Sequence, residues 1–212
     1  MNARDAVARP AIALVLLASA CASRVPRAPY QSFTLDPPPV RAVPAPGATT
    51  IVALHPTDAN ATYGGVELVY RVGEHTIERD PYASFAAAPT SMLTTAIRGY
   101  LKSSDFIRDV VYPGEDVRVN LEIEPAVMEL CGDFTNASQP EAVMSIFFRV
   151  LVPPSGAAPS REILLKRYTE RRPIEKRTAA SVVAAMNQDL EAIMAQFLAD
   201  LKAALPPPRP AG

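Results

Sequence analysis

Few side chains in this sequence combine the type and the spacing that catalysis or metal binding requires. His55 and His75 are the only histidines among 212 residues, and neither lies near a cysteine or a second histidine at zinc-site spacing. Glu122 and Glu124 lie two residues apart on an expected strand, where such a pair is usually a solvated surface. Neither a glycine-rich phosphate loop nor a Gly-x-Ser-x-Gly elbow occurs. The sequence therefore predicts no enzyme, no metal site and no cofactor.

Cys21 is the residue whose neighbours predict a definite chemistry. Two arginines precede an apolar run at residues 11–17, and small residues follow directly before the cysteine. This is the order of a secretory signal, and the run is about half of the ~20 residues that span a bilayer. Residues 17–21 resemble the lipobox that lipoprotein signal peptidase reads, although Ala18 stands where Leu is usual.

We therefore expect a signal peptide at residues 1–20, cleavage before Cys21 and lipid attached to its sulfur. The alternative is an ordinary signal peptide that leaves Cys21 as a free thiol. Ala22 and Ser23 follow the cysteine in place of the aspartate that commonly retains lipoproteins in the inner membrane. This favours an anchor in the outer membrane, on its periplasmic face. Cys131 then has no disulfide partner and is expected to be a small buried hydrophobe.

The composition indicates how the rest of the chain is organised. Seven prolines between residues 22 and 48 predict that residues 21–48 form the lipidated cysteine and an extended tether, with a short strand at 32–35. A folded domain is expected at residues 49–205, followed by a proline-rich tail at 206–212. The formal charge of −1 and the lack of a clustered basic face argue against nucleic acid as a partner.

Alternating and continuous apolar runs predict the strands of this domain. Val117 to Ile123 alternates apolar and polar residues, and we expect it to form an antiparallel meander with two later strands. A hairpin is expected around Gly73, with its second strand ended by Asp80 and Pro81. The expected strands are 49–54, 66–72, 75–79, 117–123, 143–152 and 162–170.

Two amphipathic helices are expected, at about 89–103 and 179–205. Pro89 suits a first helical turn, and the second helix carries an apolar stripe from Val183 to Leu201. The stripe favours packing on the sheet over a coiled-coil partner, because it contains fewer than four clean heptads. The predicted fold is α+β, a single domain with a mainly antiparallel sheet packed by two helices.

Two stretches carry a family resemblance: FTLDPPP at residues 33–39 and VELVYRVGEHTIERDPYASFAAAPTSMLTTAIRGYLKSSDF at 66–106. With the lipobox, they resemble the ABC-type transport auxiliary lipoprotein component family, which includes paraquat-inducible protein C and lipoproteins encoded with mammalian-cell-entry-type transporters. The resemblance covers roughly residues 30–203, including Ala185-Met186-Asn187 in the last helix. Phe85 stands where the family often has Trp.

The resemblance implies an accessory subunit with no catalytic residues. Such lipoproteins work beside an inner-membrane ATP-binding cassette transporter and its periplasmic substrate-binding subunit, and move phospholipid or other hydrophobic compounds. Assembly with further copies of the same chain is compatible with this role. Two alternatives remain open: a carrier that holds lipid around Met186, Ile193 and Phe197, and an envelope or peptidoglycan-assembly lipoprotein.

Overall fold

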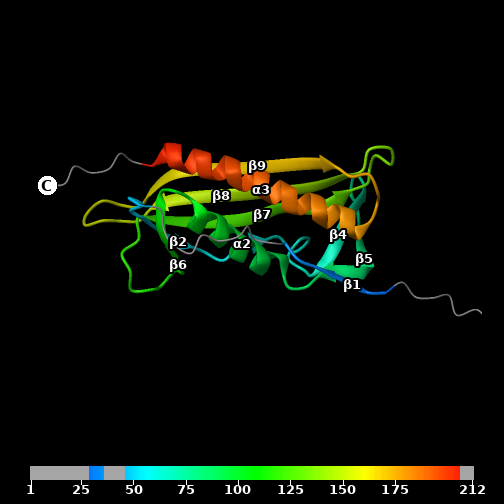
Figure 1. Ribbon diagram of the computed structural model, residues 1–212, viewed down its shortest axis with the longest axis horizontal. Coiled ribbons are helices and arrows are strands. Elements are labelled where there is room, and N and C mark those ends of the chain that lie inside the picture. Colours follow the sequence, from blue (N-terminus) through cyan, green and yellow to red (C-terminus); the bar gives the residue numbers. More distant parts are fainter. Residues whose placement is uncertain (1–28, 36–45, 206–212) are drawn as a thin grey trace, which may run out of the picture. The chain divides into compact units, whose positions relative to one another are not determined.

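The computed structural model describes residues 29–35 and 46–205, and its compact unit begins at Gln31 (Figure 1). Cys21, the expected signal peptide and the proline-rich tail therefore lie outside the described residues, as does most of the expected tether.

An antiparallel meander forms the centre of the sheet, as the sequence predicted. β7 (Leu121–Asp133) pairs with β8 (Glu141–Val152), and β8 pairs with β9 (Arg161–Pro173). The three strands are long because their alternating and apolar runs continue without a helix-forming period. Helix α3 (Ala179–Ala204) follows and lies across the meander (Figure 1).

The other edge of β7 is shared by three short strands. β2 (Thr50–Leu54), β3 (Asp58–Ala59) and β4 (Glu67–Gly73) pair with successive stretches of β7, and all three run parallel to it. The predominantly antiparallel sheet that the sequence predicted thus includes parallel pairs as well. β7 is therefore hydrogen-bonded on both edges, and it connects the meander to the rest of the sheet.

The remaining strands extend the sheet from β2 and β4. β5 (Thr76–Phe85) forms a hairpin with β4, and β1 (Gln31–Phe33) pairs parallel to β5. The short strand expected near residues 32–35 is thus present as β1. β6 (Ile107–Val111) pairs parallel to β2, and the sequence did not predict it or β3.

Several predicted strand ends are wrong. The largest difference is at the end of β7, which runs to Asp133 and not to residue 123. β5 continues through Pro81 because the chain bulges there, and the Tyr82 N–H donates to the Asp80 carboxylate at 2.8 Å. β7 begins at Leu121 and not at residue 117, because Asn120 is bound to β2 through its side chain. Its Oδ1 accepts from the Ile51 N–H at 2.7 Å, and its own N–H donates to the Ile51 carbonyl at 2.8 Å.

Both helices occur where the sequence placed them, and both lie on the same face of the sheet (Figure 1). α2 (Pro89–Ser103) starts with proline in its first turn, and the Thr178 side chain accepts from the Ser181 N–H at the start of α3. α3 packs on β8 and β9, whereas α2 packs on β6 and contacts α3. Packing on the sheet, and not a coiled coil, accounts for the stripe of α3.

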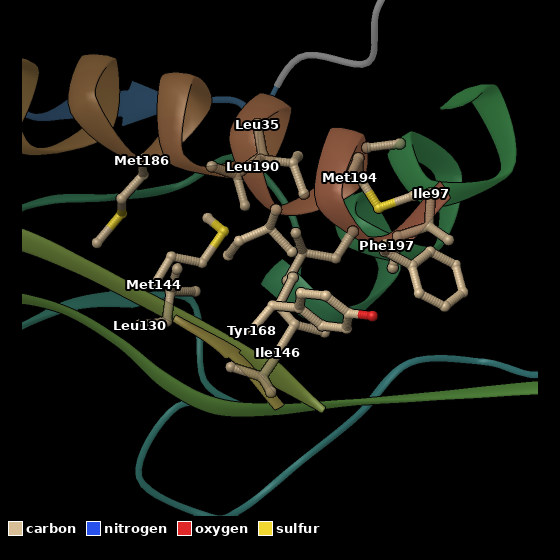
Figure 2. Packing of buried hydrophobic residues seen from close by; sticks show 14 of the residues in the cluster. Leu35, Ile97, Leu130, Met144, Ile146, Tyr168, Met186, Leu190, Met194 and Phe197 are labelled. Atoms are coloured by element: carbon tan, nitrogen blue, oxygen red, sulfur yellow. The ribbon is translucent and has the colours of Figure 1, made fainter. Parts of the chain in front are cut away.

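The core between α3 and the meander is closely packed by aromatic side chains. Phe197 stacks on Phe148 with ring centroids 3.9 Å apart, and Tyr168 meets both rings edge-on. Met186 and Ile193 from the predicted stripe are also buried here, and Figure 2 shows Met186 beside Met144. The side chains of the protein itself therefore occupy the space around Phe197.

This packing predicts a large stability loss when Phe197 is truncated. Phe197→Ala removes both aromatic contacts from a fully buried site, so the free energy of unfolding should fall by about 3–5 kcal/mol. Ala199→Ser, on the exposed side of the same helix, should change it by less than about 0.5 kcal/mol. Urea unfolding followed by circular dichroism measures both values, and equal losses would contradict the packing described here.

Candidate functional site

The histidines and carboxylates that the sequence singled out form surface contacts. His55 Nε2 lies 3.9 Å from Glu122 Oε2, and His75 is exposed beside Glu74. Glu124 lies 3.4 Å from an Arg149 nitrogen. Across residues 29–35 and 46–205, no three of the His, Cys, Asp and Glu side chains gather as metal ligands would. These residues therefore form polar contacts at the surface, on the sheet and in the turn between β4 and β5.

Cys131 is fully buried, which confirms its expected place as a small hydrophobe. Burial raises the pKa of its thiol to about 11, because the thiolate would lose its hydration there. The thiol therefore stays protonated and unreactive at neutral pH. Cys21 lies outside the described ranges, and within them no helix has the length and apolarity needed to cross a membrane.

A bulge in β7 places acidic side chains on the face of the sheet away from the helices. Val127 pairs with Ile146, Leu130 pairs with Met144, and all four are core residues. The two pairs are two positions apart on β8 but three positions apart on β7, so β7 has one extra residue between them. As a result Glu129, Cys131 and Asp133 turn to the opposite face. The bulge is the local reason why a polar cluster forms beside an apolar core.

These acidic groups form an ion-pair network with two arginines, which we call the Arg71 network. Arg71 on β4 binds both Glu129 and Asp133, with its Nη1 3.1 Å from Asp133 Oδ2. Arg171 on β9 lies 3.4 Å from the same oxygen and 3.7 Å from Glu141. The network therefore ties β4, β7, β8 and β9 together at one end of the sheet.

The Asp133 carboxylate is held ionised within this network. Burial alone would raise its pKa, but hydrogen bonds from Thr135 and the charges of Arg71 and Arg171 outweigh burial, so the pKa lies below its ordinary value. Asp133 thus keeps its negative charge at neutral pH. Its geometry suits a fixed structural contact and not proton transfer.

An aromatic stack lies next to the Arg71 network. Tyr70 stacks on Phe134 with centroids 5.0 Å apart, and the Arg177 guanidinium lies 4.5 Å from the Phe134 centroid. A Cβ at Gly132 would come within 2.9 Å of the Tyr70 ring, so only glycine permits this stack. This cluster has no signature in the sequence, because its members come from three separate segments.

A buried carboxylate links α3 to β9. The Asp189 side chain is fully buried, and its Oδ1 accepts from Arg172 Nε at 2.8 Å. Its Oδ2 has no hydrogen-bond partner among the described residues. The pKa of Asp189 is raised to about 6, because burial, with a smaller contribution from the charge of Glu170, outweighs the hydrogen bond and the charge of Arg172. Asp189 follows Met186 by three positions on the apolar stripe, and a carboxylate at this spacing is a sequence signal for a buried charge.

The N-terminal segment is fastened to the same helix. Leu35 is buried in the core, and the Asn187 side chain donates to the Thr34 carbonyl at 3.3 Å. Figure 2 shows Leu35 beside Leu190. The residues that directly follow β1 are therefore part of the folded unit.

The meander leaves its second face uncovered by helices. Ala126, Phe147, Arg149, Leu165 and Arg167 share this side of β7, β8 and β9, and we call them the open face. Leu165 is 53% exposed, and Phe147 and Ala126 are half-buried. This is a surface on which another molecule can be bound, with both apolar and charged groups.

Asp189 predicts a stability that falls as the pH rises. Its pKa is higher in the folded chain than in the unfolded chain, so its contribution is complete below pH about 4 and is lost as the pH rises through about 6. Between pH 4 and pH 8 the free energy of unfolding of Asp189→Asn should therefore vary less than that of the unmodified protein, by on the order of 2 kcal/mol. Urea unfolding from pH 4 to 8 measures the effect.

Two further variants separate this ion pair from a general pH effect. Arg172→Met leaves the Asp189 carboxylate without its partner, so it should destabilise the protein more at pH 8 than at pH 5. Glu175→Gln, at an exposed carboxylate three residues after Arg172 in the sequence, should keep the pH profile of the unmodified protein. A profile that Asp189→Asn leaves unchanged would refute the assignment.

Comparison with solved structures supports the fold. A protein from Xanthomonas campestris, XCC0632, superimposes with a TM-score of 0.64 at 18% identity, over 84% of this chain and 96% of that chain. Protein CT253 from Chlamydia trachomatis superimposes with a TM-score of 0.53 at 12% identity, over 74% of this chain and 98% of that chain. No curated protein matches the sequence.

The sequence model of one family matches most of the folded unit. The match covers residues 33–197, from β1 through most of α3, and so includes the meander, both helices and the Arg71 network. This confirms the resemblance found in the sequence. The chain belongs to the ABC-type transport auxiliary lipoprotein component family.

Proposed function

We propose that this protein is a lipid-anchored, non-catalytic accessory subunit of an ABC-type transporter of the mammalian-cell-entry-linked kind, which moves phospholipids or other hydrophobic compounds. The observation that carries the proposal is the family match over residues 33–197. The transporter type and its cargo come from the resemblance of residues 66–106 to lipoproteins encoded with such transporters. The protein contributes attachment and binding, and its transporter partner contributes the energy.

The anchor assigned to Cys21 accounts for membrane attachment. Each methylene of an acyl chain that enters the bilayer contributes about 0.8 kcal/mol, so two or more chains hold a small domain stably. Ala22 and Ser23 favour the outer membrane, with the folded unit in the periplasm. In this position the domain meets the periplasmic part of a transporter whose membrane subunits lie in the inner membrane.

The packing of the core favours docking over lipid carriage. A carrier would need room for acyl chains between α3 and the meander, but Phe197, Phe148 and Tyr168 pack directly against one another there. The surface, by contrast, offers the open face and the Arg71 network. We therefore assign the protein a binding role through its surface, with lipid held by other subunits.

The anchor is tested by replacing its sulfur. Cys21→Ser should abolish acylation, so the protein should move from the membrane fraction to the soluble periplasmic fraction. Cys131→Ala, which removes the buried thiol, should leave fractionation unchanged. Mass spectrometry of the mature N-terminus should show acyl groups at Cys21, and a free thiol at that position would refute the anchor.

The transporter partner is tested by purification from cross-linked cells. The tagged, full-length protein should recover the periplasmic substrate-binding subunit of an ABC transporter, together with its membrane subunits. The Cys21→Ser variant serves as the control, because loss of the anchor should reduce recovery while the folded unit is retained. If no transporter subunit is recovered with the unmodified protein, the proposed function is wrong.

A further inference from the structure

β9 has one edge without a neighbouring strand. Among the described residues it pairs only with β8, and it runs for 13 residues from Arg161 to Pro173. An unpaired edge of this length presents a row of backbone N–H and C=O groups to which another strand can be added. Proteins usually protect such an edge with charged side chains, and β9 is rich in them.

The charges of β9 are predominantly positive. The strand contains five basic and two acidic residues, a net charge of +3, whereas the whole chain has a formal charge of −1. Three of the basic residues are already paired within the described part of the chain. Lys166 contacts Asp200 at 2.7 Å, Arg172 contacts Asp189, and Arg171 belongs to the Arg71 network.

The two other basic residues have no acidic partner within the described ranges. Arg161 and Arg167 are both exposed, and neither forms an ion pair or a hydrogen bond through its side chain there. Tyr168 packs against Phe197 on the helix side, so its neighbours Arg167 and Thr169 point to the opposite face. Arg167 therefore belongs to the open face, with its charge available to a partner.

Apolar side chains accompany this available charge. Leu165 lies two residues before Arg167 on the same face, and Phe147 lies directly opposite Arg167 on β8. Leu165 is 53% exposed, which is unusual for a strand edge whose charges serve only to prevent aggregation. On β9 the open face thus presents an exposed apolar side chain, Leu165, beside an unpaired cation, Arg167.

We propose that β9 and the open face bind an extended, acidic segment of a partner polypeptide by strand addition. The backbone of the segment pairs with the free edge of β9. Its acidic side chains meet Arg167 and Arg161, and its apolar side chains cover Leu165 and Phe147. This inference rests on the proposed function and places the transporter partner on this surface.

Charge argues against a second copy of this chain as the occupant of the edge. Pairing β9 with β9 of another copy would bring the unpaired Arg161 and Arg167 of both copies to one edge, and like charges close to each other are destabilising. An acidic segment instead neutralises Arg161 and Arg167. Electrostatic complementarity of this kind selects the partner and speeds its association.

Site-specific photo-cross-linking in cells tests the inference on the full-length protein. p-Benzoylphenylalanine is introduced at Leu165 and, in a matched control, at Val117, an apolar residue 43% exposed outside the open face. We expect a cross-linked product at position 165 and not at position 117. Mass spectrometry should map the product to a segment of a transporter subunit in which acidic and apolar residues alternate.

Charge reversal provides the second arm of the experiment. Arg167→Glu should reduce the yield of the product about tenfold, whereas Arg108→Glu, at an exposed arginine on β6, should leave it unchanged. Circular dichroism and urea unfolding must show that both variants fold like the unmodified protein.

Several outcomes would overturn the inference. These are a product between two copies of the chain, a product with lipid, a segment without acidic residues, a yield that Arg167→Glu does not change, or no product at position 165. If transporter subunits still co-purify in any of these cases, the accessory function stands and only the binding surface is wrong. If they do not, both fail.

Discussion

The pairing of β7 along both edges is the constraint on which the rest of the structure depends. On one edge β8 pairs with it over almost its whole length, and on the other β2, β3 and β4 pair with it one after another. Loss of this strand would separate the meander from the hairpin and from the strands beneath α2. Each buried backbone N–H or C=O group of the neighbouring strands that lost its partner in β7 would destabilise the fold by about 1–3 kcal/mol.

The bulge in β7 gives the two faces of the sheet different chemistry. Before the bulge, alternate residues such as Ile123 and Val127 face the helices, and after it the pattern shifts by one residue, so that Leu130 takes that side. The acidic residues that follow are therefore kept out of the core. A single extra residue thus allows closely packed aromatic rings on one face and the Arg71 network on the other.

The sequence allowed the helices and the meander to be predicted because their patterns are long. The stripe of α3 recurs over 26 residues, and β8 is a continuous apolar run.

The features that the sequence did not predict have local causes. β3 and β6 are too short to show a period, and Pro81 suggested a strand end where none occurs. β7 continues past its predicted end at Ile123, and its Pro125 is accommodated opposite the gap between β2 and β3. The Arg71 network and Asp189 depend on packing, which residue spacing alone does not reveal. The Cys21 motif is local in sequence and stays a prediction, because Cys21 lies outside the described residues.

The distribution of paired and unpaired charges on β9 separates a structural role from a binding role. On the helix side of the strand, Lys166 and Arg172 meet Asp200 and Asp189 of α3, so their charges hold the helix on the sheet. On the other side, Arg171 is held by the Arg71 network at one end of the strand, while Arg167 remains exposed beside Phe147. Desolvating a charge without a partner is costly, so a surface that combines an unpaired cation with apolar groups gains most from a ligand that supplies both a carboxylate and apolar contact. An accessory protein with a filled core offers binding energy only at its surface, and this part of β9 is where apolar area, charge and free backbone groups coincide.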